Sequence, residues 1–325
     1  MAYISRIADA NTDLHKALQI VGLQESVKSD SVVFVKPNLT YPIYRPGVTT
    51  NPQMLKSLLL VLKDTARTVI VGESDGGNRS FSADSAFEGH GLRTICNEAG
   101  AELVNLSRLP SSPIEGHVQK KKVKVILPNL LLDEVDCLIS MPVLKVHAMT
   151  GVSLSMKNLW GCYPDTMRGL HHKNLDQKLA LITKVLKPMF EVIDGSYALD
   201  EHGPLYGVPR KTELLMCANN PVLADALGAS ILGIPLDRAR HILVAHQEKL
   251  GPIALNSAVI GNWKQYQMKF AVTRTPIDHL STLLFRSEIL AKAVMDSPLT
   301  PILNRVADLL RNPEEDEVSS HMGRY

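Results

Sequence analysis

Aromatic residues are scarce in this chain of 325 residues, where Phe, Trp and Tyr together make up 5%. Surfaces that bind single-stranded nucleic acid depend on aromatic side chains for base stacking. The formal net charge is only +2, which offers little attraction to a phosphate backbone. The composition therefore argues against nucleic acid as the main partner.

Cysteine is also rare, and its spacing excludes several kinds of site. The four cysteines are Cys96, Cys137, Cys162 and Cys217, and no two of them form a C-x-x-C pair. Zinc ribbons and ferredoxin-type iron–sulfur modules need such closely spaced thiols. We therefore expect no iron–sulfur cluster of the chain's own. No secretory signal is recognised at the start, so disulfides are not expected either.

Long hydrophobic runs are missing as well, since no stretch reaches the roughly 20 apolar residues that a membrane helix needs. We expect no membrane association and a cytoplasmic location. Hydrophobic residues make up 45% of the chain and charged residues 21%, which is the balance of a globular protein with a sizeable core. The sequence leaves the oligomeric state open, a homodimer included.

Apolar segments in the first half of the chain alternate between the strand and the helix pattern. A β-branched run and the apolar stripes that follow it predict strand, helix, strand, helix, strand in this order: Ser31–Lys36, Asn51–Leu62, Val69–Gly72, Phe87–Ala99 and Glu102–Leu106. Such alternation predicts an α/β fold with a mostly parallel sheet and helical crossovers. Ligands of such sheets bind beyond the carboxyl ends of the strands, where we expect a cleft.

The second half continues the pattern less regularly. We predict an edge strand or hairpin arm, three further strands and two helical segments: Lys120–Ile126, Val135–Met141, Phe190–Asp194, Leu214–Ala218, Ala180–Leu186 and Asn220–Leu232. Asn220 and Pro221 are suited to begin the last of these helices and Gly233 to end it. We expect an α/β core domain over residues 1–240, a mainly helical extension over 241–311 and a disordered tail over 312–325.

Polar residues follow the first two predicted strands directly. Lys36 and Asn38 end the first strand, and a lysine beside an amide can hold an anionic oxygen. The second strand leads into Glu73-Ser74-Asp75-Gly76-Gly77. Gly76 and Gly77 allow the backbone to approach a ligand closely, whereas the two carboxylates are candidate ligands of a hard cation. A plain strand-capping turn is the alternative for the first segment, and a strand-to-helix turn is the alternative for the second.

The segment from Pro142 to Gly161 carries the densest group of candidate residues. Lys145 and His147 follow a predicted buried strand, and at extended spacing both point to the same side. Lys157 and Asn158 add further polar groups among Leu, Met and Val. An imidazole can move a proton near neutral pH, and a lysine can clamp an anion or act as a base. We predict that His147, Lys145 and Lys157 are catalytic and that Asn158 binds the substrate.

Two later segments add weaker candidates. Of the adjacent histidines after Arg168, at most one is expected to enter the site, and His171 is predicted to bind substrate. Asp194 ends a predicted strand at the ligand side, so we assign it to catalysis or to a metal. Together with Glu73, Asp75 and Glu201 it forms the predicted metal-ligand set.

These pieces together resemble domain of unknown function family 362. The matching blocks are KPN (Lys36–Asn38), TTNP (Thr49–Pro52), PVLKVHAMTGVSLSMKNLWG (Pro142–Gly161), DGSYALDEHGPLYG (Asp194–Gly207) and NPVLADALGASILG (Asn220–Gly233). Many members of the family look as if they are joined to a ferredoxin-type cluster domain, which implies redox chemistry for those proteins. This chain departs from that pattern because its cysteines cannot form such a module.

The leading functional hypothesis is an enzyme that acts on a small anionic metabolite. Lysines would hold carboxylate or phosphate oxygens, His147 would move a proton, and a divalent cation is one option for the carboxylates. Isomerisation, racemisation, elimination and hydrolysis all fit. The alternatives are a non-catalytic protein that binds a metabolite or a metal, and a redox enzyme that depends on a partner.

Overall fold

The computed structural model describes residues 1–285, 287–295 and 297, and the structural account is confined to them. Within this part the chain forms a ten-stranded mixed sheet in the order β12-β1-β11-β10-β7-β2-β3-β4, with β8 paired to β10 and β9 to β8. The predicted α/β fold with a mostly parallel sheet is confirmed. The strands are β1 (Ala2–Arg6), β2 (Val32–Pro37), β3 (Thr68–Glu73), β4 (Glu102–Asn105), β7 (Cys137–Met141), β8 (Val143–His147), β9 (Gly151–Ser153), β10 (Phe190–Asp200), β11 (Val208–Ala218) and β12 (Val259–Ile260).

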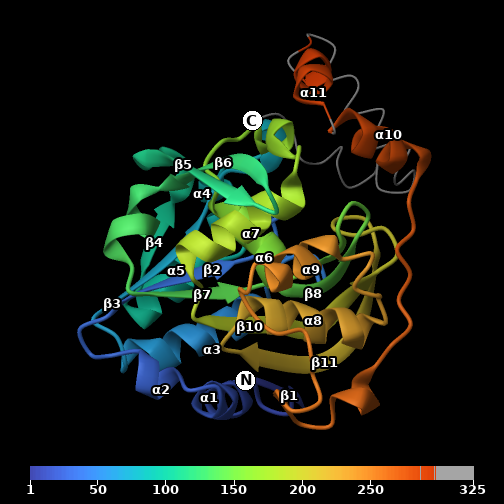
Figure 1. Cartoon of the computed structure of the whole chain (residues 1–325). Coiled ribbons are helices and arrows are strands. Elements are labelled where there is room, and N and C mark those ends of the chain that lie inside the picture. Colours follow the sequence, from blue (N-terminus) through green and yellow to red (C-terminus); the bar gives the residue numbers. More distant parts are fainter. Residues whose placement is uncertain (286, 296, 298–325) are drawn as a thin grey trace.

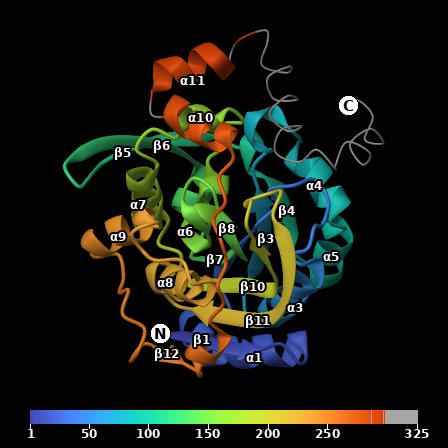
Figure 2. The same cartoon turned by 90° about the vertical axis from the view of Figure 1, so that its right-hand side faces the viewer.

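Helices cover both faces of this sheet (Figure 1). One face packs against α1 (Ala10–Ile20), α3 (Pro52–Lys63), α4 (Ala83–Gly89) and α5 (Leu92–Ala99), and the other against α6 (Ser155–Asn158), α7 (Leu175–Leu186), α8 (Pro221–Leu232) and α9 (Arg240–Gln247). Figure 2 shows the sheet between these two layers. Each face has its own apolar core, so β2 and β7 are buried from both sides. Ile242, Val244 and Ala245 of α9 belong to the same core as α7 and α8.

The remaining elements are a hairpin, short helical segments and two C-terminal helices. A separate hairpin, β5 (Ser111–Val118) with β6 (Lys121–Pro128), includes the predicted Lys120–Ile126 arm. Short helical segments are α2 (Leu23–Ser26), η1 (Gly77–Arg79), η2 (Leu106–Arg108), η3 (Leu130–Glu134), η4 (Leu159–Cys162), η5 (Arg168–His171) and η6 (Trp263–Tyr266). Two helices follow near the C-terminus, α10 (Pro276–Leu284) and α11 (Glu288–Met295). The remainder of the predicted extension and the predicted tail at 312–325 lie outside the described residues.

Local sequence signals account for several helix boundaries. The Asn220 carboxamide accepts N–H groups of Val222 and Leu223, both at 3.0 Å, and the predicted first residue of α8, Pro221, follows it. Gly233 ends α8 at a φ of +72°. The single helix predicted over Phe87–Ala99 is wrong, because Gly91 takes a φ of +67° and divides it into α4 and α5. A left-handed residue cannot continue an α-helix.

The chain reverses its direction across the sheet between β2 and β7. From β2 it passes through α3, α4 and α5 to β3 and β4, and from β7 through α6 and α7 to β10 on the opposite side. The two runs use helices on opposite faces, so the connections that leave β2 and β7 diverge. In open α/β sheets ligands bind at such a switch point, beyond the carboxyl ends of the strands.

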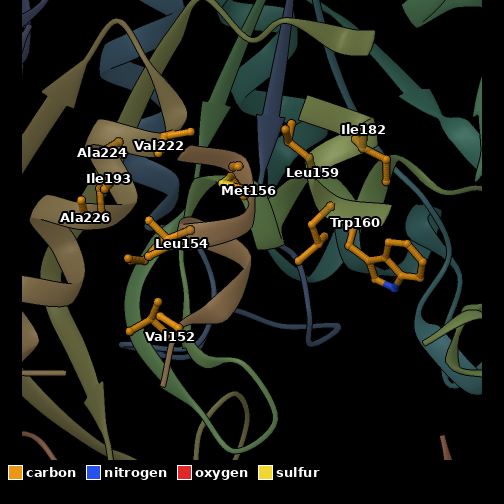
Figure 3. Packing of buried hydrophobic residues seen from close by; sticks show 14 of the residues in the cluster. Val152, Leu154, Met156, Leu159, Trp160, Ile182, Ile193, Val222, Ala224 and Ala226 are labelled. Carbon is orange, nitrogen blue, oxygen red and sulfur yellow. The ribbon is translucent and has the colours of Figure 1, made fainter. Parts of the chain in front are cut away.

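The segment Gly151–Gly161 lies directly on the core of the α8 side. Val152, Leu154 and Met156 are fully buried and pack near Val222, Ala224 and Ala226 (Figure 3). Leu154 also fills the space over Gly228, where a Cβ atom would come within 2.6 Å of its Cδ1. The apolar side chains of this segment therefore fix its backbone, and the polar residues between them are held in place.

Replacing Leu154 by Ala should leave a void against α8. Truncation of a buried leucine costs about 2–5 kcal/mol, and we expect a loss of this size in the free energy of unfolding measured by urea denaturation. The matched control is Leu60→Ala on α3, where the side chain is 39% exposed. Equal effects of the two substitutions would contradict the packing of Leu154 on α8.

Candidate functional site

A cavity of about 660 Å³ opens at the carboxyl ends of β2, β3 and β8. Its walls are the turns that follow these strands, the segment from Ser153 to Gly161, η5, the loop 202–206 and residues of α10 and α11. The predicted cleft thus lies at the expected edge of the sheet. A second hollow of about 460 Å³ between α1 and α3 has only His15 and Asp64 as titratable lining residues, so it carries no comparable cluster.

An ion pair joins the ends of β2 and β3 behind this cavity. The Lys36 ammonium lies 2.5 Å from the Glu73 carboxylate, and it also donates to the carbonyl of Pro37. Glu73 further accepts the N–H groups of Leu39 at 3.3 Å and Ser74 at 2.9 Å. Lys36 is fully buried and Glu73 nearly so. The pair therefore compensates its own charge and fixes the turns that leave both strands.

Asn38 connects the predicted residues of separate segments. Its side-chain oxygen accepts from the Lys145 ammonium at 2.9 Å, and its amide nitrogen donates to the Asn158 oxygen at 3.2 Å. Asn158 in turn donates to the carbonyl of Lys36 at 2.9 Å and to the Ser140 hydroxyl at 3.1 Å. The structure thus brings Lys36, Asn38, Lys145 and Asn158 into one hydrogen-bonded network.

Lys145 is a fully buried amine whose three hydrogen-bond partners are all uncharged. Besides Asn38 it donates to the carbonyl of Val48 at 2.7 Å and to the Thr40 hydroxyl at 3.2 Å. Burial, followed by repulsion from Lys157, lowers the pKa of Lys145 to about 7. The site can therefore hold or release this proton near neutral pH.

Two further cations line the cavity itself. Burial and the nearby Arg168 guanidinium lower the pKa of Lys157 to about 8. Arg168 donates to the backbone carbonyls of Tyr163, at 2.9 Å, and of Asp75. Within the described ranges neither Lys157, Arg168 nor Lys145 forms an ion pair with a carboxylate. Glu73 and Asp278 are the carboxylate residues of the lining, and Asp278 accepts from Thr275 at the start of α10.

His147 lies at the end of β8 and faces this cationic group. Its Nδ1 accepts the N–H of Met149 at 3.0 Å, so the neutral ring carries its proton on Nε2. Burial, then Lys157 and Lys145, lower the pKa of His147 well below its usual value. The ring is therefore neutral at physiological pH. Among the described residues none hydrogen-bonds to Nε2, which leaves this N–H to a ligand.

Of the two adjacent histidines, His172 lines the cavity and His171 does not. His171 pairs with the Asp165 carboxylate at 2.8 Å, and its ring lies tilted against Tyr163 with the ring centroids 5.0 Å apart. The His172 Nδ1 donates to the carbonyl of Gly169 at 2.9 Å, and burial followed by Lys157 lowers its pKa to about 3. One histidine does enter the site, and a substrate role for His171 stays a prediction.

Of the other predicted residues, the two glycines line the cavity and two of the carboxylates do not. Gly76 and Gly77 line the cavity, and a Cβ atom on Gly76 would meet the Ser80 hydroxyl oxygen at 2.5 Å. Asp75 accepts from Ala83 and Asn105, and Glu201 lies 3.9 Å from Arg210. Neither lines the cavity.

Asp194 lies outside the cavity lining too. It is buried beside the first turn of α3, where its carboxylate accepts the N–H groups of Asn51 at 2.8 Å and Ser196 at 3.0 Å. Across residues 1–285, 287–295 and 297, no three His, Cys, Asp or Glu side chains form a group suited to a metal ion. The predicted metal set of Glu73, Asp75, Asp194 and Glu201 is therefore dispersed.

A buried carboxylate on α8 positions the residues of α6. Asp225 accepts the N–H groups of Ser155 at 2.7 Å and Met156 at 3.1 Å. These two residues begin α6, the helical turn that carries Lys157 and Asn158. Burial, together with Asp225, raises the pKa of the neighbouring Glu191 well above its usual value. Glu191 is therefore neutral at physiological pH.

Several lining residues had no assigned role in the sequence. Arg168 opened a candidate segment but was not selected, and His172 was passed over for its neighbour. Trp160 lay within the Pro142–Gly161 block, whereas Phe285 lies far along the chain with no motif around it. The clustering of polar residues could have identified Arg168 and His172. Only tertiary structure brings in Phe285.

Comparisons with known proteins find a family, a relative and a solved structure to which this chain is similar. A family model described as Domain of unknown function (DUF362) matches residues 33–230. A thylakoid-associated protein of Synechocystis sp. is 26% identical over 266 residues, which cover 75% of this chain and 78% of that protein. A solved structure from Thermotoga maritima has a TM-score of 0.35 and 13% identity, with 62% of this chain and 52% of that one covered. The chain spans about half the length of the Thermotoga maritima protein.

Replacing Glu73 by Gln should leave the Lys36 charge buried without its counterion. Breaking a buried pair in this way costs about 3–5 kcal/mol, and we expect this loss in the free energy of unfolding measured by urea denaturation. Adding Lys36→Met to Glu73→Gln should recover part of it.

The control for this experiment is Glu98→Gln. It breaks the surface pair of Lys56 and Glu98, whose side chains are 36% and 50% exposed. Exposed pairs contribute about 1 kcal/mol or less. If Glu73→Gln lowered the free energy of unfolding no more than Glu98→Gln, the buried ion pair would not hold the turns that follow β2 and β3.

Proposed function

We propose that this chain, which belongs to the Domain of unknown function (DUF362) family, is an enzyme that acts on a small anionic metabolite. The observation that carries the proposal is the group of cations at the cavity. Lys145, Lys157 and Arg168 lie together. In the described part of the chain Lys145 and Arg168 donate hydrogen bonds only to uncharged groups, and Lys157 forms no ion pair. An anion in the cavity would supply the missing negative charge.

The arrangement supports a division of labour among these residues. Arg168 and Lys157 would hold carboxylate or phosphate oxygens, because both line the cavity. Lys145 would add positive charge from behind Asn38 and Thr40. The His147 Nε2–H would donate to a substrate oxygen, as a neutral imidazole of depressed pKa can. Lys157, with a pKa of about 8, is suited to take up or deliver a proton near neutral pH.

A single proton transfer on a clamped anion fits isomerisation, racemisation, elimination or hydrolysis. Asp194 stays a predicted catalytic residue, and its position beside Asn51 suits support of the turn before α3. The metal role of the dispersed carboxylates also stays a prediction, which elemental analysis of the purified protein measures.

Two alternatives from other classes remain distinct from this proposal. A non-catalytic binding protein would use the same cations without a need for proton transfer. A redox enzyme would need electrons from a partner, since the four cysteines are buried free thiols. No helix in the described ranges is long and apolar enough to cross a membrane. We propose a cytoplasmic location, while the Synechocystis relative is described as thylakoid-associated.

Replacing His147 by Ala should abolish turnover and leave the fold intact. Purified wild-type protein would be incubated with a bacterial metabolite extract, and anionic compounds that it consumes would be identified by mass spectrometry. Loss of a general acid or of a proton donor costs about 10²–10⁴-fold in rate. The control His117→Ala changes an exposed histidine of β5. Consumption by the His147→Ala protein at the wild-type rate would exclude His147 from catalysis, and binding without any product would favour the non-catalytic alternative.

Anion affinity should fall as the pH rises. Deprotonation of Lys145 at a pKa of about 7 and of Lys157 at a pKa of about 8 removes positive charge from the site, so the affinity begins to fall near neutral pH and the part of the loss that depends on Lys157 appears around and above its pKa. A charged hydrogen bond contributes about 1.5–3 kcal/mol, which corresponds to about tenfold or more in affinity.

Sulfate is the suitable probe because it is the anion of a strong acid and stays fully ionised from about pH 6.5 to about pH 9.5, so a change in its affinity reflects titration of the protein. Isothermal titration calorimetry should show that the dissociation constant of sulfate rises over this range in the wild-type protein. In the Lys157→Met variant most of the rise above about pH 8 should be absent, because the group that titrates there is gone. A wild-type affinity that does not change with pH would contradict the role of Lys157.

A further inference from the structure

The cavity has a second character besides its charge, namely an aromatic wall. Phe81, Trp160, Tyr206 and Phe285 all line it, although aromatic residues make up only 5% of the chain. The His172 ring lies between two of them, with ring centroids 5.7 Å from Trp160 and 5.0 Å from Phe285. Scarce aromatic side chains are thus concentrated at one place.

Separate parts of the chain build this wall. Trp160 comes from η4 and His172 follows η5, whereas Phe285 follows α10 near the C-terminus. Ala291 and Val294 of α11 extend the apolar lining, and α11 contacts η5. Figure 2 shows α10 and α11 together at one end of the molecule, apart from the sheet. The C-terminal helices therefore complete a surface that the α/β core alone leaves open.

We propose that the ligand of this cavity is an amphipathic organic anion, in which a carboxylate or phosphate is attached to a flat aromatic body. This inference rests on the proposed function and specifies its substrate class. The charged group would lie on Lys157 and Arg168, and the aromatic body would stack along Trp160, His172 and Phe285.

The size of the cavity supports this choice over a very small anion. About 660 Å³ is in the range of pockets that enclose ligands of drug-like size. An acetate or an inorganic phosphate would fill the cationic end alone and leave the partly exposed rings of Phe81, Tyr206 and Phe285 against water, whereas Trp160 is already buried. An aromatic body instead removes apolar surface of both ligand and wall from water, which is favourable.

Three probes separate the two parts of the ligand. Naphthalene-2-carboxylate has both ring and charge, naphthalen-2-ylmethanol has the ring alone, and acetate has the charge alone. We expect isothermal titration calorimetry at pH 7 to show that the carboxylate binds at least about tenfold more tightly than either of the others, since each half contributes.

Two variants place the binding in the cavity. Lys157→Met should weaken binding of naphthalene-2-carboxylate and of acetate by about tenfold and leave naphthalen-2-ylmethanol unchanged. Phe285→Ala should weaken both naphthalene compounds and leave acetate unchanged. The matched controls are Lys173→Met, at an exposed lysine, and Leu283→Ala, at a side chain of α10 that is 58% exposed. Phe285→Leu replaces Phe285→Ala should the latter not fold.

The possible outcomes distinguish the two proposals. If acetate binds as tightly as naphthalene-2-carboxylate, or if loss of the Phe285 ring does not affect the naphthalene compounds, the aromatic substrate class is overturned. The proposed function survives that result as long as acetate binding depends on Lys157. If no anion depends on Lys157, the proposed function itself fails.

Discussion

The buried ion pair of Lys36 and Glu73 is the interaction on which the geometry of the site depends. It joins the carboxyl ends of β2 and β3, and Glu73 also holds the N–H groups of the two turns that follow. Gly161 packs directly over the pair, because a Cβ atom there would lie 2.5 Å from the Glu73 carboxylate and 2.8 Å from the Lys36 ammonium. Three segments of the chain are therefore fitted around one neutralised charge pair.

Lys145 and Arg168 differ from Lys36 because their hydrogen-bond acceptors are uncharged, and this difference leaves the cavity with a positive potential. Lys145 is surrounded by an amide oxygen, a hydroxyl and a carbonyl, and Arg168 by carbonyls. Such groups satisfy hydrogen bonds without cancelling charge, so the positive potential persists. Burial, and after it this positive potential, lower the pKa values of Lys157 and His147. A site built from dipoles around cations retains its attraction for an anion, whereas one built from carboxylates would lose it.

The sequence predicted the framework well where the signal was local. The β-branched run of β2 and the Asn220-Pro221 start of α8 depend on nearby residues, and both elements were predicted near their observed bounds. β10 was predicted to stop at Asp194 but continues to Asp200, because its second half follows a bulge and pairs with β8 and β11. Strands β1 and β5 carry too little apolar pattern to be recognised without their partners.

The site was only partly predictable for a related physical reason. Spacing after a strand indicates that Lys36, Glu73 and His147 reach one edge of the sheet, and the structure brings Lys36, Asn38, Lys145 and Asn158 together there. Spacing does not indicate which charges compensate one another, so the partnership of Lys36 with Glu73 had no sequence signal. Nor does it distinguish His171 from His172 in a short 3-10 turn, or connect Phe285 to cationic residues that lie far earlier in the chain.

The cationic groups come from β2, β8, α6 and η5, so no single segment carries the site by itself. A compound that fits the cavity must therefore bind the folded chain and not the unfolded one, and mass action then raises the melting temperature. At a concentration one hundred times the dissociation constant the gain is about 2.7 kcal/mol. Thermal-shift screening of organic anions can consequently search for the natural ligand before any reaction is known, with the fold itself as the reporter.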